Sequence, residues 1–214
     1  MIFSFEKPRM AFLSSCDLFA TEKKALPGVT VYSDEETARS HSVRWKGMIA
    51  GKQWYAAEIP AADTFLYRSK PVAEQPFPVL HSLLSEKSLS MVFAEELTVF
   101  RWQLSCYLKD RRQEEAGVLS AEETLVFFHE KRNTLLALAS GETLINFVKE
   151  KATRKEPEVI PAYFSALNIS GVIDETDGNT TFLIFNPHAS IKILSIHREN
   201  HTYPAISPLR STKS

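Results

Sequence analysis

Short apolar runs separated by turn residues dominate the pattern along the chain. In residues 42–59, aromatic and aliphatic side chains lie on both sides of Gly51-Lys52, a short glycine-containing turn. This arrangement is typical of an antiparallel hairpin. The apolar stretch at residues 10–13 predicts a buried first strand, and residues 64–68 predict a further extended segment.

The middle of the chain fits two interpretations. Residues 90–93 and 97–102 favour two strands joined at Glu95-Glu96, with one amphipathic helix over 89–108 as the alternative, because short apolar runs do not fix the period. Residues 124–129 and 134–139 flank a charged tetrapeptide and favour a second hairpin. Against that hairpin, Ser120 followed by Glu122-Glu123 is a pattern typical of a helix cap.

The rest of the chain has clearer helix and strand patterns, and these indicate how it divides into subdomains. Helices are expected over 80–84, 141–151 and 157–167, and strands over 181–185 and 191–196. The prolines in residues 70–78 exclude helix and interior strand there. We expect an α+β fold of antiparallel β-hairpins with about three to five helices. Its parts are an N-terminal β-rich subdomain at 1–70, a proline-rich connection at 71–78, an α+β subdomain at 79–203 and a loose tail at 204–214; a single domain is the alternative.

Composition narrows the classes of function. The chain is 44% hydrophobic and 24% charged with a formal net charge of −1, which is typical of a soluble globular protein. We expect no nucleic-acid partner, because no basic excess exists to neutralise phosphates. No uncharged run reaches the length of a transmembrane segment.

The two cysteines, Cys16 and Cys106, lie far apart in the sequence and have no metal-binding or redox spacing. A reducing compartment, the cytoplasm, is therefore expected, and one disulfide between them is the alternative. An alternative concerns Cys16, because residues 13–16 resemble a bacterial lipoprotein cleavage box. The apolar stretch before it is short for a signal peptide. Lipidation at Cys16 therefore stays an open alternative.

The familiar catalytic motifs are missing from the chain. Neither G-x-G-x-x-G, G-x-S-x-G nor H-E-x-x-H occurs, and we expect no cofactor. The best chemical candidate is His197, Glu199 and His201, because alternation places these residues on one face if a strand continues past Ile196. Two imidazoles and a carboxylate can hold a divalent metal, so a metal-dependent enzyme is the alternative function.

The leading hypothesis is a non-enzymatic interaction or scaffold protein that binds a protein partner. The predicted hairpins can offer edges for strand addition, and Trp45, Trp54 and Tyr55 are the expected anchors. The order hairpin, helix, helix, hairpin over Glu123 to Glu199 is similar to that of degenerate actin-like domains in pilus-assembly and secretion platforms. That resemblance implies an accessory component of a larger assembly, without ATP hydrolysis, because the glycine-rich phosphate loops of working actin-like ATPases are not present.

Overall fold

One mixed sheet organises the protein. The computed structural model describes residues 9–14, 28–42, 53–109, 111, 113–152, 156, 158–176, 179–198 and 201–204. In these residues eight strands pair in the order β4-β5-β6-β2-β1-β3-β7-β8. The strands are β1 (Arg9–Ser14), β2 (Val29–Tyr32), β3 (Gln53–Ile59), β4 (Phe65–Tyr67), β5 (Gly171–Thr176), β6 (Asn179–Ile184), β7 (Lys192–Arg198) and β8 (His201–Pro204).

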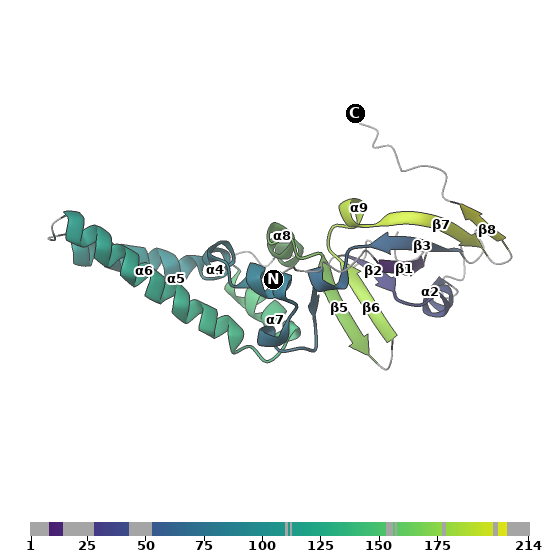
Figure 1. Cartoon of the computed structure of the whole chain (residues 1–214), viewed down its shortest axis with the longest axis horizontal. Helices are drawn as coiled ribbons and strands as arrows, with labels where there is room; N and C mark the ends of the chain where they lie inside the picture. Colours follow the sequence, from purple (N-terminus) through teal and green to yellow (C-terminus); the bar gives the residue numbers. More distant parts are fainter. Residues whose placement is uncertain are drawn as a thin grey trace, which may run out of the picture.

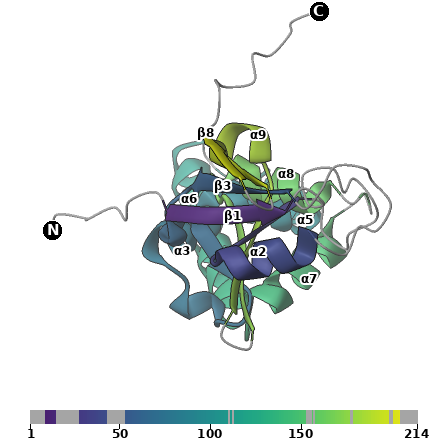
Figure 2. The same cartoon turned by 90° about the vertical axis from the view of Figure 1, so that its right-hand side faces the viewer.

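Helices cover the sheet in two places. The described residues contain eight α-helices, more than the sequence predicts: α2 (Glu35–Ser42), α3 (Phe77–Leu83), α4 (Glu86–Val92), α5 (Ala94–Leu108), α6 (Gln113–Leu136), α7 (Gly141–Lys151), α8 (Val159–Ala166) and α9 (Pro187–Ser190). Short 3-10 turns are η1 (Ala62–Thr64) and η2 (Val72–Glu74). Helix α2 packs across β1, β2 and β3 (Figure 2). Helices α3 to α8 lie between β4 and β5 in the sequence and form a layer at one end of the sheet (Figure 1).

The sheet joins strands from both ends of the described chain. Strand β2 pairs with β6, β3 pairs with β7, and β4 pairs with β5. The β4–β5 pair is parallel and the other pairs among the described strands are antiparallel, so the fold is a mixed α and β structure and not a set of hairpins alone. The proline-rich connection at 71–78 carries the chain from the sheet to the helical layer. The expectation that its prolines exclude helix is wrong, because it contains η2 and the start of α3, in which Pro78 occupies the first turn, where no backbone N–H is needed.

Several expected elements are confirmed. The strands expected at 10–13, 64–68, 181–185 and 191–196 correspond to β1, β4, β6 and β7. The helices expected over 80–84, 141–151 and 157–167 correspond to α3, α7 and α8, with bounds that differ by a few residues. Within the described part, no helix combines the length and apolar character that crossing a membrane requires.

The two strand pairs expected in the middle of the chain are wrong. Residues 90–92 lie in α4, Phe93 lies between α4 and α5, residues 97–102 lie in α5, and residues 124–136 lie in the long helix α6. The Ser85 hydroxyl begins α4 by accepting a hydrogen bond from the Ser88 amide at 3.2 Å. Because the hairpin expected within 123–139 is helical, the element order that resembled actin-like domains is not present.

The predicted hairpin over residues 42–59 is also wrong in its pairing. Its second strand exists as β3, but β3 pairs with β1 along residues 54–59 and with β7 along residues 53–58. Both edges of β3 are therefore occupied by other strands. The proposed turn at Gly51-Lys52 lies outside the described residues.

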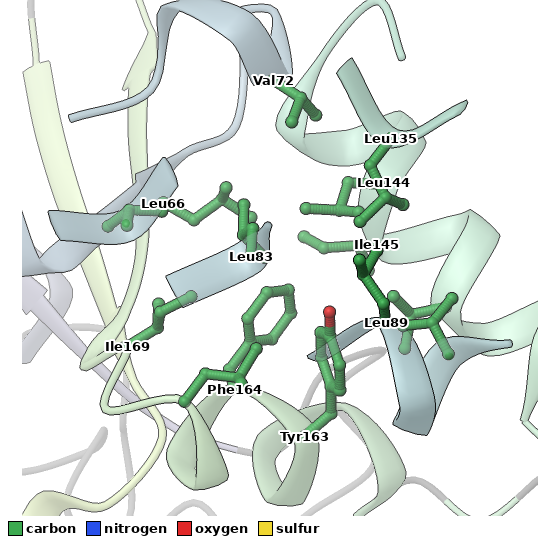
Figure 3. Close-up of a cluster of buried hydrophobic side chains, with 14 of the residues drawn as sticks. Leu66, Val72, Leu83, Leu89, Leu135, Leu144, Ile145, Tyr163, Phe164 and Ile169 are labelled. Carbon is green, nitrogen blue, oxygen red and sulfur yellow. The ribbon is translucent and has the colours of Figure 1, made fainter. Parts of the chain in front are cut away.

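Two apolar clusters hold the layers together. Neighbouring residues on β4 and β5 alternate between them: Leu66 and Val172 join the helical cluster, whereas Phe65 and Ile173 join a cluster made by the sheet itself. Figure 3 shows the helical cluster, in which side chains from β4, α3, α4, α6, α7 and α8 converge. The sheet thus fixes where the helical layer sits.

The edge of the sheet at β4 is closed by a side chain. The backbone N–H of Tyr67 donates to Gln75 Oε1 at 2.7 Å, and Gln75 Nε2 donates to the Tyr67 carbonyl at 2.9 Å. The buried Gln75 amide therefore takes the place of a neighbouring strand at this residue. Strand addition, expected from the sequence as a binding mode, is blocked at this point.

Candidate functional site

The most prominent surface feature is an antiparallel helical hairpin formed by α5 and α6. It extends from the helical layer away from the sheet (Figure 1). Its inner seam contains a stacked pair, Phe100 and Phe127, whose ring centroids lie 4.8 Å apart. Leu97 and Phe127 are buried in this seam. The two helices thus support each other along their facing sides.

The base of the hairpin is fixed to α7 by charge. Glu96 on α5 accepts hydrogen bonds from Lys131 on α6 and Lys151 on α7. Lys131 Nζ also lies 5.1 Å from the ring centroids of Phe93 and Phe127, which gives a cation–π contact to each ring. Burial raises the pKa of the Glu96 carboxyl, but the hydrogen bonds from the two lysines outweigh it and hold that pKa below its usual range.

Large apolar side chains gather on the outside of the hairpin. Of the ten large hydrophobic residues that are exposed in the described part, six lie on these two helices. They are Val99 (53%), Trp102 (66%) and Tyr107 (59%) on α5, and Val118 (61%), Leu125 (61%) and Val126 (54%) on α6. On an ordinary protein surface, exposed apolar residues are scattered singly, whereas here they are concentrated on two helices.

The main outer residues point away from the seam. Residues two positions apart on a helix lie on nearly opposite sides. Trp102 is two positions from Phe100, and Leu125 is two positions from Phe127, so both outer side chains face away from the stacked pair. Each helix is therefore apolar on its inner and on its outer side, a pattern typical of a helix covered all round.

The aromatic anchors expected from the sequence have different environments. Trp54 is only 6% exposed, and its Nε1 donates to Glu35 Oε1 on α2 at 2.8 Å. Its ring stacks on His197 at a centroid distance of 5.7 Å, and it ties α2 to the sheet. Tyr55 is partly buried against the sheet cluster. Trp45 lies outside the described residues, so its role stays a prediction.

The proposed metal ligands do not share one continuous strand. Strand β7 ends at Arg198, and β8 returns antiparallel from His201, with His197 paired to Thr202 and Arg198 paired to His201. Positions 197 and 201 therefore belong to opposite faces of the ribbon. Glu199 lies outside the described residues. Among the described residues, no group of three or more potential ligands is placed to hold a metal.

One polar cluster under α2 has an arrangement familiar from acyl transfer. Ser195 Oγ lies 2.7 Å from His197 Nε2, and His197 Nδ1 lies 3.8 Å from Glu35 Oε1. The second distance is too long for a hydrogen bond, and the same Glu35 oxygen accepts the Trp54 indole N–H. The cluster therefore satisfies polar groups between α2 and the sheet, and we assign it no catalytic role.

No known protein family, curated protein or solved structure matches the chain.

Proposed function

We propose that this protein is a non-enzymatic interaction or scaffold protein and that the outer faces of the α5–α6 hairpin are its binding surface. The observation that carries the proposal is the set of six large apolar side chains exposed on this hairpin. Moving one such side chain from water into a fully buried contact is favourable by about 1.5–3 kcal/mol. A protein partner recovers that free energy on binding.

The chemistry of the surface supports the same role. Trp102 and Tyr107 are of the residue types that dominate binding hot spots, because they bury a large area at a small cost in side-chain entropy. The base of the hairpin is held by Glu96, Lys131 and Lys151, so the surface is ordered before a partner arrives. The thiol of Cys106 is exposed and free, which supports a reducing compartment such as the cytoplasm.

Alanine substitution on the hairpin tests the proposal. Proteins that copurify with the wild-type chain from its native cells are compared with those recovered by Trp102→Ala and by Leu125→Ala. Truncating a hot-spot anchor typically costs about 2 kcal/mol or more, so we expect recovery of the specific partner to fall by at least about tenfold. Thermal unfolding should change little, because both side chains are exposed.

Phe77→Ala is the matched control, because Phe77 on α3 is 60% exposed but lies outside the hairpin. It should keep every partner. The series also includes Trp45→Ala and Trp54→Ala, the anchors expected from the sequence. Trp54→Ala should lower stability, since the ring is buried against α2. Equal recovery of all proteins by the hairpin variants and the wild type contradicts the proposed surface.

A further inference from the structure

Toward the tip of the hairpin, the two outer faces carry opposite charge. On α5, Lys109 continues the helix as its C-terminal cap and lies on the same side as Val99 and Trp102. Nearer the base, the exposed Glu95 lies four residues before Val99 on that side, so the positive charge of this face is confined to the tip. On α6, Glu115 and Glu122 lie on the same side as Val118. Within the part of the chain that the structure describes, Lys109, Glu115 and Glu122 form no ion pair, so their charges are available to a partner.

Each outer face also has the spacing of a helix-packing seam. Alternating steps of three and four residues place one set of side chains along one side of a helix, as in coiled coils. Every member of the two sets is exposed. The α5 stripe consists of Val99, Trp102, Cys106 and Lys109, and the α6 stripe consists of Glu115, Val118, Glu122, Leu125 and His129.

The two stripes match in height along the hairpin. Phe100 stacks on Phe127, so these two residues lie at the same level along the hairpin. Because the helices are antiparallel, moving one residue forward on α5 is matched by moving one residue backward on α6. Trp102 is therefore level with Leu125, and Lys109 is level with Val118. Val118 lies between Glu115 and Glu122 in its stripe. If an α5 stripe packs beside an α6 stripe with these levels aligned, Trp102 meets Leu125. In the same alignment Lys109 lies between Glu115 and Glu122.

These stripes cannot meet within one chain, because both point away from the seam. We propose that a second copy of this chain is the occupant, with the α5 stripe of one copy packed against the α6 stripe of the next. The proposal rests on the proposed function and names its partner. Because the contact is head to tail, each copy keeps one free stripe, and assembly continues beyond a dimer into larger species.

Charge reversal tests the contact on the full chain. Lys109→Glu makes both stripes acidic, and Glu115→Lys/Glu122→Lys makes both stripes basic. The wild type should form species larger than a dimer in analytical ultracentrifugation under reducing conditions, in amounts that rise with concentration and fall with salt. Each variant alone should associate at least about tenfold more weakly, since like charges then face each other. An equimolar mixture of the two variants should recover association, because each acidic stripe meets a basic one.

Lys149→Glu on α7 is the matched control, because Lys149 is exposed and belongs to neither stripe, and it should assemble as the wild type does. Circular dichroism shows whether each variant keeps its helices. A wild type that stays monomeric or stops at a dimer, or folded variants that assemble unchanged, overturns the second copy as occupant. Loss of a different protein partner in Trp102→Ala, with a monomeric wild type, overturns this inference but leaves the proposed function standing.

Discussion

Gly171 shows how closely β5 approaches its neighbour. A Cβ atom at this position would lie 1.9 Å from the Leu183 carbonyl oxygen, which is backbone and cannot turn aside. We expect Gly171→Ala to lower the free energy of unfolding by about 3 kcal/mol or more, because the β5–β6 ladder must separate to admit the methyl group. Urea denaturation followed by circular dichroism measures the change.

Gly117 supplies the matched control in the hairpin. A Cβ atom at this position meets nothing within 4 Å, and the residue lies inside α6. Gly117→Ala should raise the free energy of unfolding by about 0.5–1 kcal/mol, because alanine loses less backbone entropy in a helix. If both alanine variants change stability equally, the close approach at Gly171 is not what constrains that position.

Tyr163 gives a stability change at high pH. Its side chain lies in the buried helical cluster (Figure 3), and its hydroxyl lies 2.6 Å from the Ser88 hydroxyl. Burial raises the pKa of Tyr163 from 10.0 to about 12. The folded state therefore keeps this proton at a pH where the unfolded chain has lost it. The contribution to stability is complete below pH 10 and is lost as pH rises to about 12, by about 2–3 kcal/mol.

Tyr163→Phe isolates that contribution. At neutral pH the variant should be less stable by about 1–2 kcal/mol, because the buried Ser88 hydroxyl loses its partner. Above pH 10 the difference between wild type and variant should shrink and then reverse, as measured by urea denaturation at a series of pH values. Tyr163→Phe/Ser88→Ala should recover most of the loss at neutral pH. A pH-independent difference contradicts the raised pKa.

At the scale of the element, Glu96 determines how firmly the hairpin is held. Its folded pKa is lowered, so its contribution is present above the ordinary value of 4.5 and disappears as pH falls through the lowered value. We expect Glu96→Gln to cost about 1 kcal/mol at pH 7, since the site is about one-third exposed and water screens the charges. Hydrogen exchange at the base of α5 and α6 should quicken. Glu95→Gln, at the exposed neighbouring residue, should change neither the stability nor the rate of hydrogen exchange.

The same hairpin explains why the sequence misleads in the middle of the chain. A helix is recognised when its apolar residues lie on one side. In α5, Phe100 and Leu104 face the seam while Val99 and Trp102 face outward, so apolar residues recur too often for one stripe. The runs then look like strands. The outer apolar residues that hide these helices are the ones that form the proposed binding surface. The steps of three and four residues along the outer stripes are the pattern by which they can be recognised as helical.

In other parts of the chain, the local sequence pattern is enough to predict the element. Helix α7 has one apolar side, with Leu144, Ile145 and Val148 buried, and a serine cap, so periodicity alone predicts it. The partners of a strand are different, because alternation shows that β3 is a strand but not that β1 and β7 flank it. Trp54 likewise looks like an exposed anchor until α2, distant from it in the sequence, supplies Glu35.

At the scale of the whole molecule, helices α3 to α8 form an insertion between the two sets of strands that build one sheet. The insertion starts after β4 and returns at β5, and these two strands are neighbours in parallel. Both ends of the hairpin-bearing layer are therefore attached to the same sheet edge. Thr64 and Ser170, on the two sides of the insertion, lie with their hydroxyl oxygens 2.9 Å apart. The hairpin projects from a fixed point and not from a flexible linker.

This arrangement has a consequence for synthesis on the ribosome. The helices between β4 and β5 pair residues close in sequence, so the hairpin can form as soon as it emerges. Strands β2 and β3 need β6 and β7, which are made last, and closing so long a loop is slow. Until then the apolar strands β1 to β3 lack their later neighbours, a state in which nascent chains aggregate or engage chaperones. The α5–α6 hairpin can therefore be folded, with its outer apolar residues exposed, before the sheet from which it projects is complete.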